Sequence, residues 1–216
     1  MSIQFNKMLY TAASRSTIVE LVMFIKDLGY KTRAIDISVN STLNAMMYLN
    51  RVDAQPDTTW LMLVVDSTSC YVLSMLGNSY VDIFEERVSI GEVLGDAENY
   101  ATIIKAVEPI LKNVPARYLC VVSKTNIISA EALAGKLTYS APITYQEANC
   151  YQRESLIECA PDVDEQTAKE ISLDVIGAAI REYFLPFSTA KINMFNKQLG
   201  ESKIGRAVQQ ECRDRY

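Results

Sequence analysis

The feature of this sequence that most constrains its fold is an unbroken apolar run, LMLVV, at residues 61–65. A strand with one face in water alternates apolar and polar residues, whereas a strand covered on both faces is apolar at each position. The run therefore predicts a central strand. The sequence then predicts a hairpin, from a turn at residues 66–68, a second apolar stretch at 70–76 and the pair Gly77-Asn78. The returning strand of this hairpin is expected at residues 80–84 and 88–90.

Segments with a helical period lie on both sides of this strand-rich region. The first, residues 17–28, starts with a T-x-x-E capping box at Thr17 and Glu20 and ends at Gly29, a residue type common after helix C-termini. Its expected apolar face consists of Ile18, Leu21, Val22, Ile25 and Leu28. A strand at residues 33–39 should follow, and then a helix that Ser41 caps.

The rest of the chain continues this alternation. Asp96 should cap a helix with an inner face made of Tyr100, Ile103, Ile104, Val107, Ile110 and Leu111. The sequence next predicts a strand at 118–122, a short helix at 129–137 and an edge strand at 142–145. The last long helix, residues 167–183, starts with a second capping box at Thr167 and Glu170, and its inner face includes Val175, Ala178 and Ala179. With a short strand at 8–13, the order predicts an α/β or α+β class with a mixed sheet.

Composition excludes several classes of function. The chain of 216 residues has no histidine, which removes Ser-His-Asp and Cys-His catalysis and histidine metal ligands. Its net charge of −5 argues against nucleic-acid binding, which needs clustered Lys and Arg. The five cysteines are scattered without a CxxC pair, so neither a zinc site nor a disulfide framework is expected, and a reducing cytoplasm suits them. No window is long and apolar enough to span a membrane.

Three segments carry a resemblance to a known family. They are residues 10–41 (YTAASRSTIVELVMFIKDLGYKTRAIDISVNS), 61–92 (LMLVVDSTSCYVLSMLGNSYVDIFEERVSIGE) and 171–182 (ISLDVIGAAIRE). In pattern and order they resemble the actin-like pilus-assembly family PilM. The resemblance implies an actin/Hsp70-like (ribonuclease H-like) fold, here incomplete at its N-terminal lobe. In that family nucleotide lies between two lobes, held by two hairpin phosphate loops and a glycine-rich adenine loop.

The chain departs from the family at each of these loops. There is no room for the first phosphate loop before residue 8. The second corresponds to Asp66, Ser67, Thr68 and Ser69, where the family's glycine is Ser67, and the Cβ of a serine restricts the approach of backbone N–H groups to phosphate. The adenine loop corresponds to residues 123–126, which contain no glycine. Two interpretations stay open: a structural Asx turn with no cofactor, or weak binding of ATP-Mg by these four residues.

The tail suggests a docking segment. Ile192, Asn193, Met194 and Phe195 resemble the cytoplasmic peptide with which PilN, the membrane partner of PilM, binds a groove on the actin-like protein. An arginine-bearing stretch follows, and a membrane span is expected beyond the chain. The segment could instead pack back on its own domain as a C-terminal staple. A parallel with the actin-like cytoplasmic part of the type II secretion platform is equally open.

These observations predict three regions: 1–55, a remnant of the first lobe; 56–186, the second actin-like lobe; and 187–216, a tail with the docking peptide. The expected function is a non-catalytic scaffold at the cytoplasmic face of a bacterial inner membrane. Its expected partners are other pilus or secretion platform proteins and the motor ATPase, with an oligomer as an open possibility. The alternative is a nucleotide-binding protein or weak ATPase.

Overall fold

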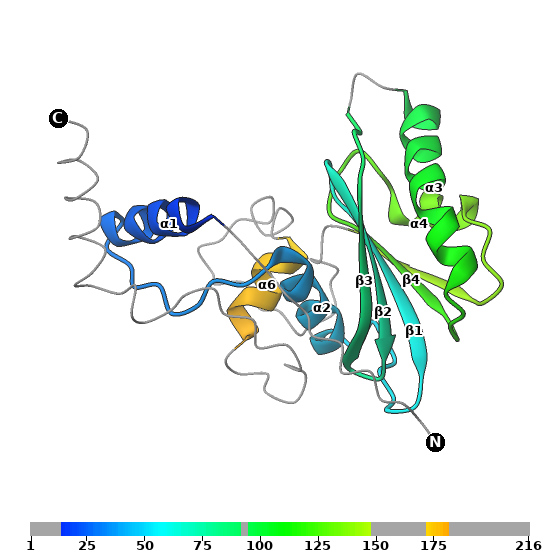
Figure 1. Ribbon diagram of the computed structural model, residues 1–216, viewed down its shortest axis with the longest axis horizontal. Helices are drawn as coiled ribbons and strands as arrows, with labels where there is room; N and C mark the ends of the chain where they lie inside the picture. The colour runs from blue at the N-terminus through cyan, green and yellow to red at the C-terminus, as the bar shows by residue number, and fades with distance from the viewer. Residues whose placement is uncertain (1–13, 92–94, 148–171, 182–216) are drawn as a thin grey trace, which may run out of the picture. The chain divides into compact units, whose positions relative to one another are not determined.

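The computed structural model describes residues 14–91, 95–147 and 172–181 (Figure 1). Contacts divide the chain into two units: residues 1–37 with 191–216, and residues 38–190. The second unit begins with helix α2 (Ser38–Tyr48). The physical reason is that α2 packs against α6 (Leu173–Ile180), which lies in the second unit.

The second unit contains a five-stranded mixed sheet. Its strands are β1 (Thr59–Val65), β2 (Ser69–Leu76), β3 (Ser79–Arg87), β4 (Leu119–Ser123) and β5 (Ile143–Gln146). Their order is β3-β2-β1-β4-β5; β2 is antiparallel to β1 and β3, and β4 is parallel to β1 and β5. The class is thus mixed α/β, as expected, and the arrangement is compatible with an actin-like fold.

Strand β1 is central and covered on both faces, which confirms the interpretation of its apolar run. Six of its seven residues are buried. One face packs against α3 (Asp96–Asn113) and α4 (Ala130–Lys136), where Ile103, Val107 and Leu133 join the core. Figure 1 shows these two helices on one side of the sheet and α2 with α6 on the other. The unit therefore has three layers, because a strand that is apolar at each position needs cover on both sides.

The layer formed by α2 and α6 depends on a close approach of the two helices. Gly177 of α6 is buried, and a Cβ placed on it would lie 1.7 Å from the backbone oxygen of Ser41 in α2. Only a residue without a side chain allows this separation. Both α2 residues on the contact, Ser41 and Ala45, are also small and buried.

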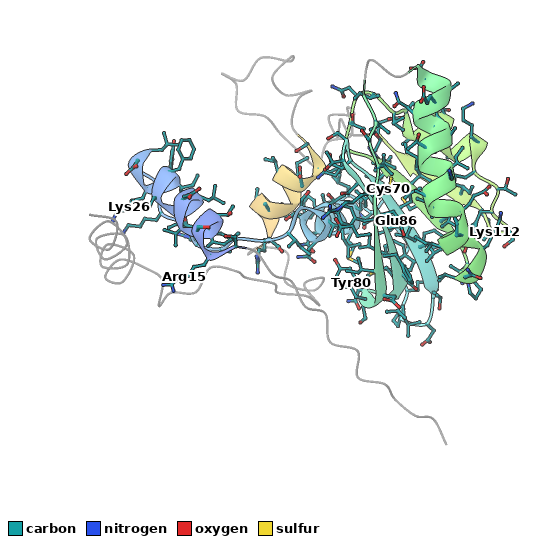
Figure 2. All side chains as sticks on the ribbon, turned by 45° about the horizontal axis from the view of Figure 1, so that its top comes forward. Arg15, Lys26, Cys70, Tyr80, Glu86 and Lys112 are labelled. Atoms are coloured by element: carbon teal, nitrogen blue, oxygen red, sulfur yellow. The ribbon has the colours of Figure 1, made fainter. Side chains whose placement is uncertain are left out.

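Helix α1 (Arg15–Asp27) belongs to the first unit, and Arg15 and Lys26 mark its ends in Figure 2. As predicted, the helix stops just before Gly29, which adopts φ +86° and whose N–H donates to the Lys26 carbonyl. The predicted capping box is wrong. The helix begins at Arg15, so Thr17 and Glu20 lie within it rather than at its start.

Other local predictions are also corrected. Residues 33–37 form no strand, and residues 38 and 39 already belong to α2, so Ser41 lies inside a helix rather than at its start. The inner face of the last helix is wrong as well: Leu173, Ile176 and Gly177 are buried, while the expected Val175, Ala178 and Ala179 are exposed. The predicted strand at 8–13 and the box at Thr167 and Glu170 lie outside the described residues.

None of the helices in the described ranges is long and apolar enough to cross a membrane.

Candidate functional site

A polar cluster lies where two neighbouring strands end. Strands β1 and β4 are parallel, and Val65 pairs with Ser123 at their last residues. Asp66 and Lys124, the next residues of each strand, therefore emerge side by side at the same edge of the sheet. The backbone fixes this arrangement, because the Lys124 N–H donates to the Val65 carbonyl at 2.8 Å.

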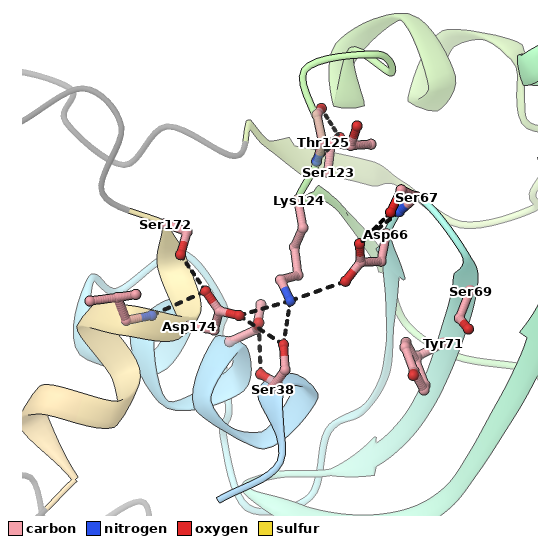
Figure 3. A network of polar contacts seen from close by, with 12 residues as sticks. Ser38, Asp66, Ser67, Ser69, Tyr71, Ser123, Lys124, Thr125, Ser172 and Asp174 are labelled. Carbon is pink, nitrogen blue, oxygen red and sulfur yellow. Dashed lines mark hydrogen bonds and ion pairs between the residues drawn. The ribbon is translucent and has the colours of Figure 1, made fainter. Parts of the chain in front are cut away.

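The ammonium of Lys124 is the centre of the cluster (Figure 3). Its Nζ lies 2.9 Å from Asp174 Oδ2 and 3.4 Å from Asp66 Oδ2, and it donates a hydrogen bond to the hydroxyl of Ser38. The side chain of Lys124 is only 9% exposed. A lysine so far removed from water needs its counter-ions, and the two carboxylates supply them.

Asp174 is held from several directions at the start of α6. Its Oδ2 accepts from the hydroxyl of Ser38 at 2.8 Å, and its Oδ1 accepts from the Ser172 hydroxyl and from the Val175 N–H at 3.1 Å. Partial burial alone would raise the pKa of this carboxyl. The hydrogen bonds from Ser172, Lys124 and Ser38, together with the charge of Lys124, outweigh burial and lower the pKa from 3.8 to about 2.

Of the four residues predicted for a phosphate loop, Asp66 alone takes part in this cluster. Its other oxygen, Oδ1, accepts from the Ser67 N–H at 2.7 Å and from the Ser67 hydroxyl at 3.3 Å, so the side chain is bound to the residue directly after it and not to the second residue on, as in an Asx turn. Its backbone N–H donates to the Ser69 carbonyl at 2.9 Å, and the Thr68 carbonyl accepts from the N–H of Val88. Both oxygens of Asp66 are therefore occupied within the protein.

The segment after β4, predicted to replace an adenine loop, is folded around a buried serine. The hydroxyl of Ser123 lies 2.9 Å from the Thr125 carbonyl and 2.7 Å from the Ile128 carbonyl. Thr125 in turn accepts from the N–H of Ile127 at 3.2 Å. These bonds fold the loop back onto Ser123, next to Lys124 at its start.

The cluster carries one positive and two negative charges, so its net charge is −1. An anion would meet the two carboxylates, and a divalent cation bound between them would have to displace the ammonium of Lys124. Among the described residues, no group of three or more cysteine, aspartate and glutamate side chains is placed to hold a metal ion.

The two cysteines in the described ranges are buried free thiols on strands. Burial raises the pKa of Cys70 to about 12, with a further contribution from the charges of Asp66 and Glu86, and it raises the pKa of Cys120 to about 11. Because the thiolate is the reactive form, neither is suited to act as a nucleophile near neutral pH.

Sequence reasoning missed three members of the cluster: Ser38, Lys124 and Asp174. The signal for Lys124 was available, because a polar residue directly after an apolar strand lies beside its counterpart on a parallel neighbour. Asp174 was missed because the sequence placed it in the middle of a helix predicted over residues 167–183, whereas α6 begins at Leu173 and Asp174 lies in its first turn. The predicted docking residues 192–195 lie outside the described residues.

Comparisons with known proteins give distant similarities. No family model and no curated protein matches the chain. Among solved structures, it is similar to a chain of a PilM-PilN type IV pilus biogenesis complex, with 10% identity, a TM-score of 0.44, and coverage of 77% of this chain and 57% of that one. It is also similar to Pelota of Archaeoglobus fulgidus (15% identity, TM-score 0.28, 64% and 39% covered). A third similarity is to the nuclease domain of the large terminase subunit gp2 of bacterial virus Sf6. The identity is 9%, the TM-score is 0.29, and the match covers 81% of this chain and 77% of that one. TM-scores this low establish neither a shared fold nor a shared function.

Proposed function

We propose that this protein is a non-catalytic, actin-like scaffold in the inner-membrane assembly platform of a type IV pilus, and that it acts by protein–protein docking. The observation that supports the non-catalytic part is the position of the Lys124 ammonium, between Asp66 and Asp174 at the edge of the sheet. The pilus part rests on the sequence resemblance of residues 10–41, 61–92 and 171–182 to the PilM family.

The cluster opposes nucleotide binding for an electrostatic reason. Nucleotide phosphates are held by free backbone N–H groups, by cationic side chains, or through a Mg²⁺ ion that prefers carboxylate and water oxygens. Here the single cation of the cluster is neutralised by two carboxylates, and the Ser67 N–H is bound to Asp66 Oδ1. Mg²⁺ at Asp66 would have to expel a lysine that is nine-tenths buried.

The proposed scaffold works through its tail and its surface. The docking segment is Ile192, Asn193, Met194 and Phe195, whose alternate apolar side chains suit pockets in a groove. The proposed partners are other platform subunits and the motor ATPase, and the proposed location is the cytoplasmic face of the inner membrane.

Limited proteolysis of the full chain tests the docking. Phe195→Ala and Asn193→Ala should speed cleavage between residues 187 and 200, because each removes a side chain that holds the segment in place. Gln198→Ala, also in the tail but outside the segment, is the matched control and should leave the cleavage rate unchanged. Equal cleavage rates for wild type, Phe195→Ala and Asn193→Ala, mapped by mass spectrometry, would refute docking of this segment.

A further inference from the structure

Helix α1 has more apolar surface than a single buried face requires. Ile18 is buried, and Val22 and Ile25, which continue its row at i+4 and i+7, are half-buried. A second row follows at i, i+3 and i+7: Leu21, Phe24 and Leu28 are 46%, 60% and 55% exposed. Contiguous exposed side chains of this size mark an interaction surface.

The border of this second row is acidic. On a helical projection with 100° per residue, Glu20 and Asp27 lie beside Phe24, on the side away from Ile18, while Lys26 lies on the far side of the helix. The face therefore suits an apolar segment that carries positive charge. The chain contains one: residues 191–197, KINMFNK, place Ile192, Met194 and Phe195 between two lysines.

We propose that the face formed by Leu21, Phe24 and Leu28, with Glu20 and Asp27 at its border, binds residues 191–197 of the same chain. The apolar side chains of the segment would cover the exposed row, and a terminal lysine would lie against the acidic border. The proposal rests on the docking segment of the proposed function and adds the surface that receives it.

The connections allow this contact within one molecule. Ten residues, 28–37, join α1 to α2, and ten residues, 181–190, separate α6 from residue 191. Helices α2 and α6 are themselves held together, since the Ser38 hydroxyl donates to Asp174 at 2.8 Å. Two connections of this length can span up to about 65 Å when extended. Tethering both partners to one helix pair also gives a high effective concentration, in the millimolar range for short flexible linkers.

Proteolysis of the full chain by a non-specific protease tests the surface. Phe24→Ser should raise the cleavage rate of residues 187–200 about tenfold, since it removes one large apolar contact. Val175→Ser, a polar substitution at another exposed apolar side chain on α6, should leave the rate unchanged. Glu20→Lys should also raise the rate, and adding Lys191→Glu or Lys197→Glu to that variant should lower it again.

Each other outcome overturns the proposal in a recognisable way. If Phe195→Ala speeds cleavage but Phe24→Ser and Glu20→Lys do not, the segment docks on a different surface and the proposed function stands. If Phe195→Ala has no effect, the docking in the proposed function fails as well. If the protection disappears on dilution of the wild-type chain, the receiving α1 belongs to a second copy or the face binds another partner, which also contradicts binding within one chain.

Discussion

The contact between α2 and α6 leads to a sharp prediction at Gly177. A Cβ at this position would lie 1.7 Å from the backbone oxygen of Ser41, 2.5 Å from its carbonyl carbon and 3.1 Å from the backbone N of Ala45. These neighbours are backbone atoms, which cannot rotate away as a flexible side chain can. Gly177→Ala therefore forces α6 away from α2 by at least 1.3 Å, the difference between 1.7 Å and 3.0 Å, below which Cβ contacts essentially never occur.

The magnitude follows from two opposing terms. Overpacking of a well-packed contact costs ~3 kcal/mol at the upper end of the usual range. Alanine in place of glycine inside a helix returns about 1 kcal/mol. The net expectation is a decrease of about 2 kcal/mol in the free energy of unfolding. The displacement also acts on Asp174, one turn earlier in α6, and weakens its ion pair with Lys124.

Urea unfolding followed by tryptophan fluorescence measures this change. Trp60, the single tryptophan, is fully buried in β1 and reports on the unit that contains both helices. Gly135→Ala in α4 is the matched control, because a Cβ there meets no atom within 4 Å. It should increase stability by up to about 1 kcal/mol. If Gly177→Ala is as stable as wild type or as Gly135→Ala, the close helix contact is refuted.

Two further predictions concern the Lys124 cluster. Lys124→Met leaves Asp66 and Asp174 without their counter-ion and should lower the free energy of unfolding by about 2 kcal/mol, less than a fully buried pair because the carboxylates are partly exposed. Lys112→Met is the control, because it removes only an exposed ion pair with Glu108. It should change the free energy of unfolding by less than about 0.5 kcal/mol in the same denaturant titration. Equal effects of the two substitutions would contradict a special role for Lys124. For pH, the folded pKa of Asp174 is about 2, below its ordinary 3.8, so its contribution to stability is present above pH 3.8 and is lost as the pH falls toward 2. The stability difference between wild type and Asp174→Asn should shrink across this window, and a difference that stays constant there would refute the shift.

The sequence predicted the sheet better than the helices that flank it. The apolar run at 61–65 and the pair Gly77-Asn78 are strong local signals, because burial on both faces and a tight hairpin each admit few residue types. The prediction of a strand at 33–39 was wrong. Alternating apolar residues show which side chains a strand could bury, but they do not show which neighbouring strand would pair with it. The capping box at Thr17 and Glu20 failed because the helix starts two residues earlier, at Arg15.

The cluster shows a similar limit. Asp66 was identified from its position after the central strand, but its partners come from segments that are distant in the sequence. Lys124 is 58 residues away and Ser38 is 86 residues from Lys124. Their meeting depends on the pairing of β1 with β4 and on the packing of α2 against α6, and neither can be derived from local periodicity. The charge balance that decides the chemical interpretation therefore became visible only in the folded chain.

The most direct test of a non-catalytic scaffold is calorimetric titration of the full chain with ATP and Mg²⁺. A scaffold that binds no nucleotide should give no saturable heat and no thermal shift, because Lys124 holds Asp66 and Asp174 together. Saturable binding of ATP-Mg would refute a non-catalytic scaffold if Asp66→Asn abolishes the binding and a Glu108→Gln control retains it. That result would support the nucleotide-binding alternative.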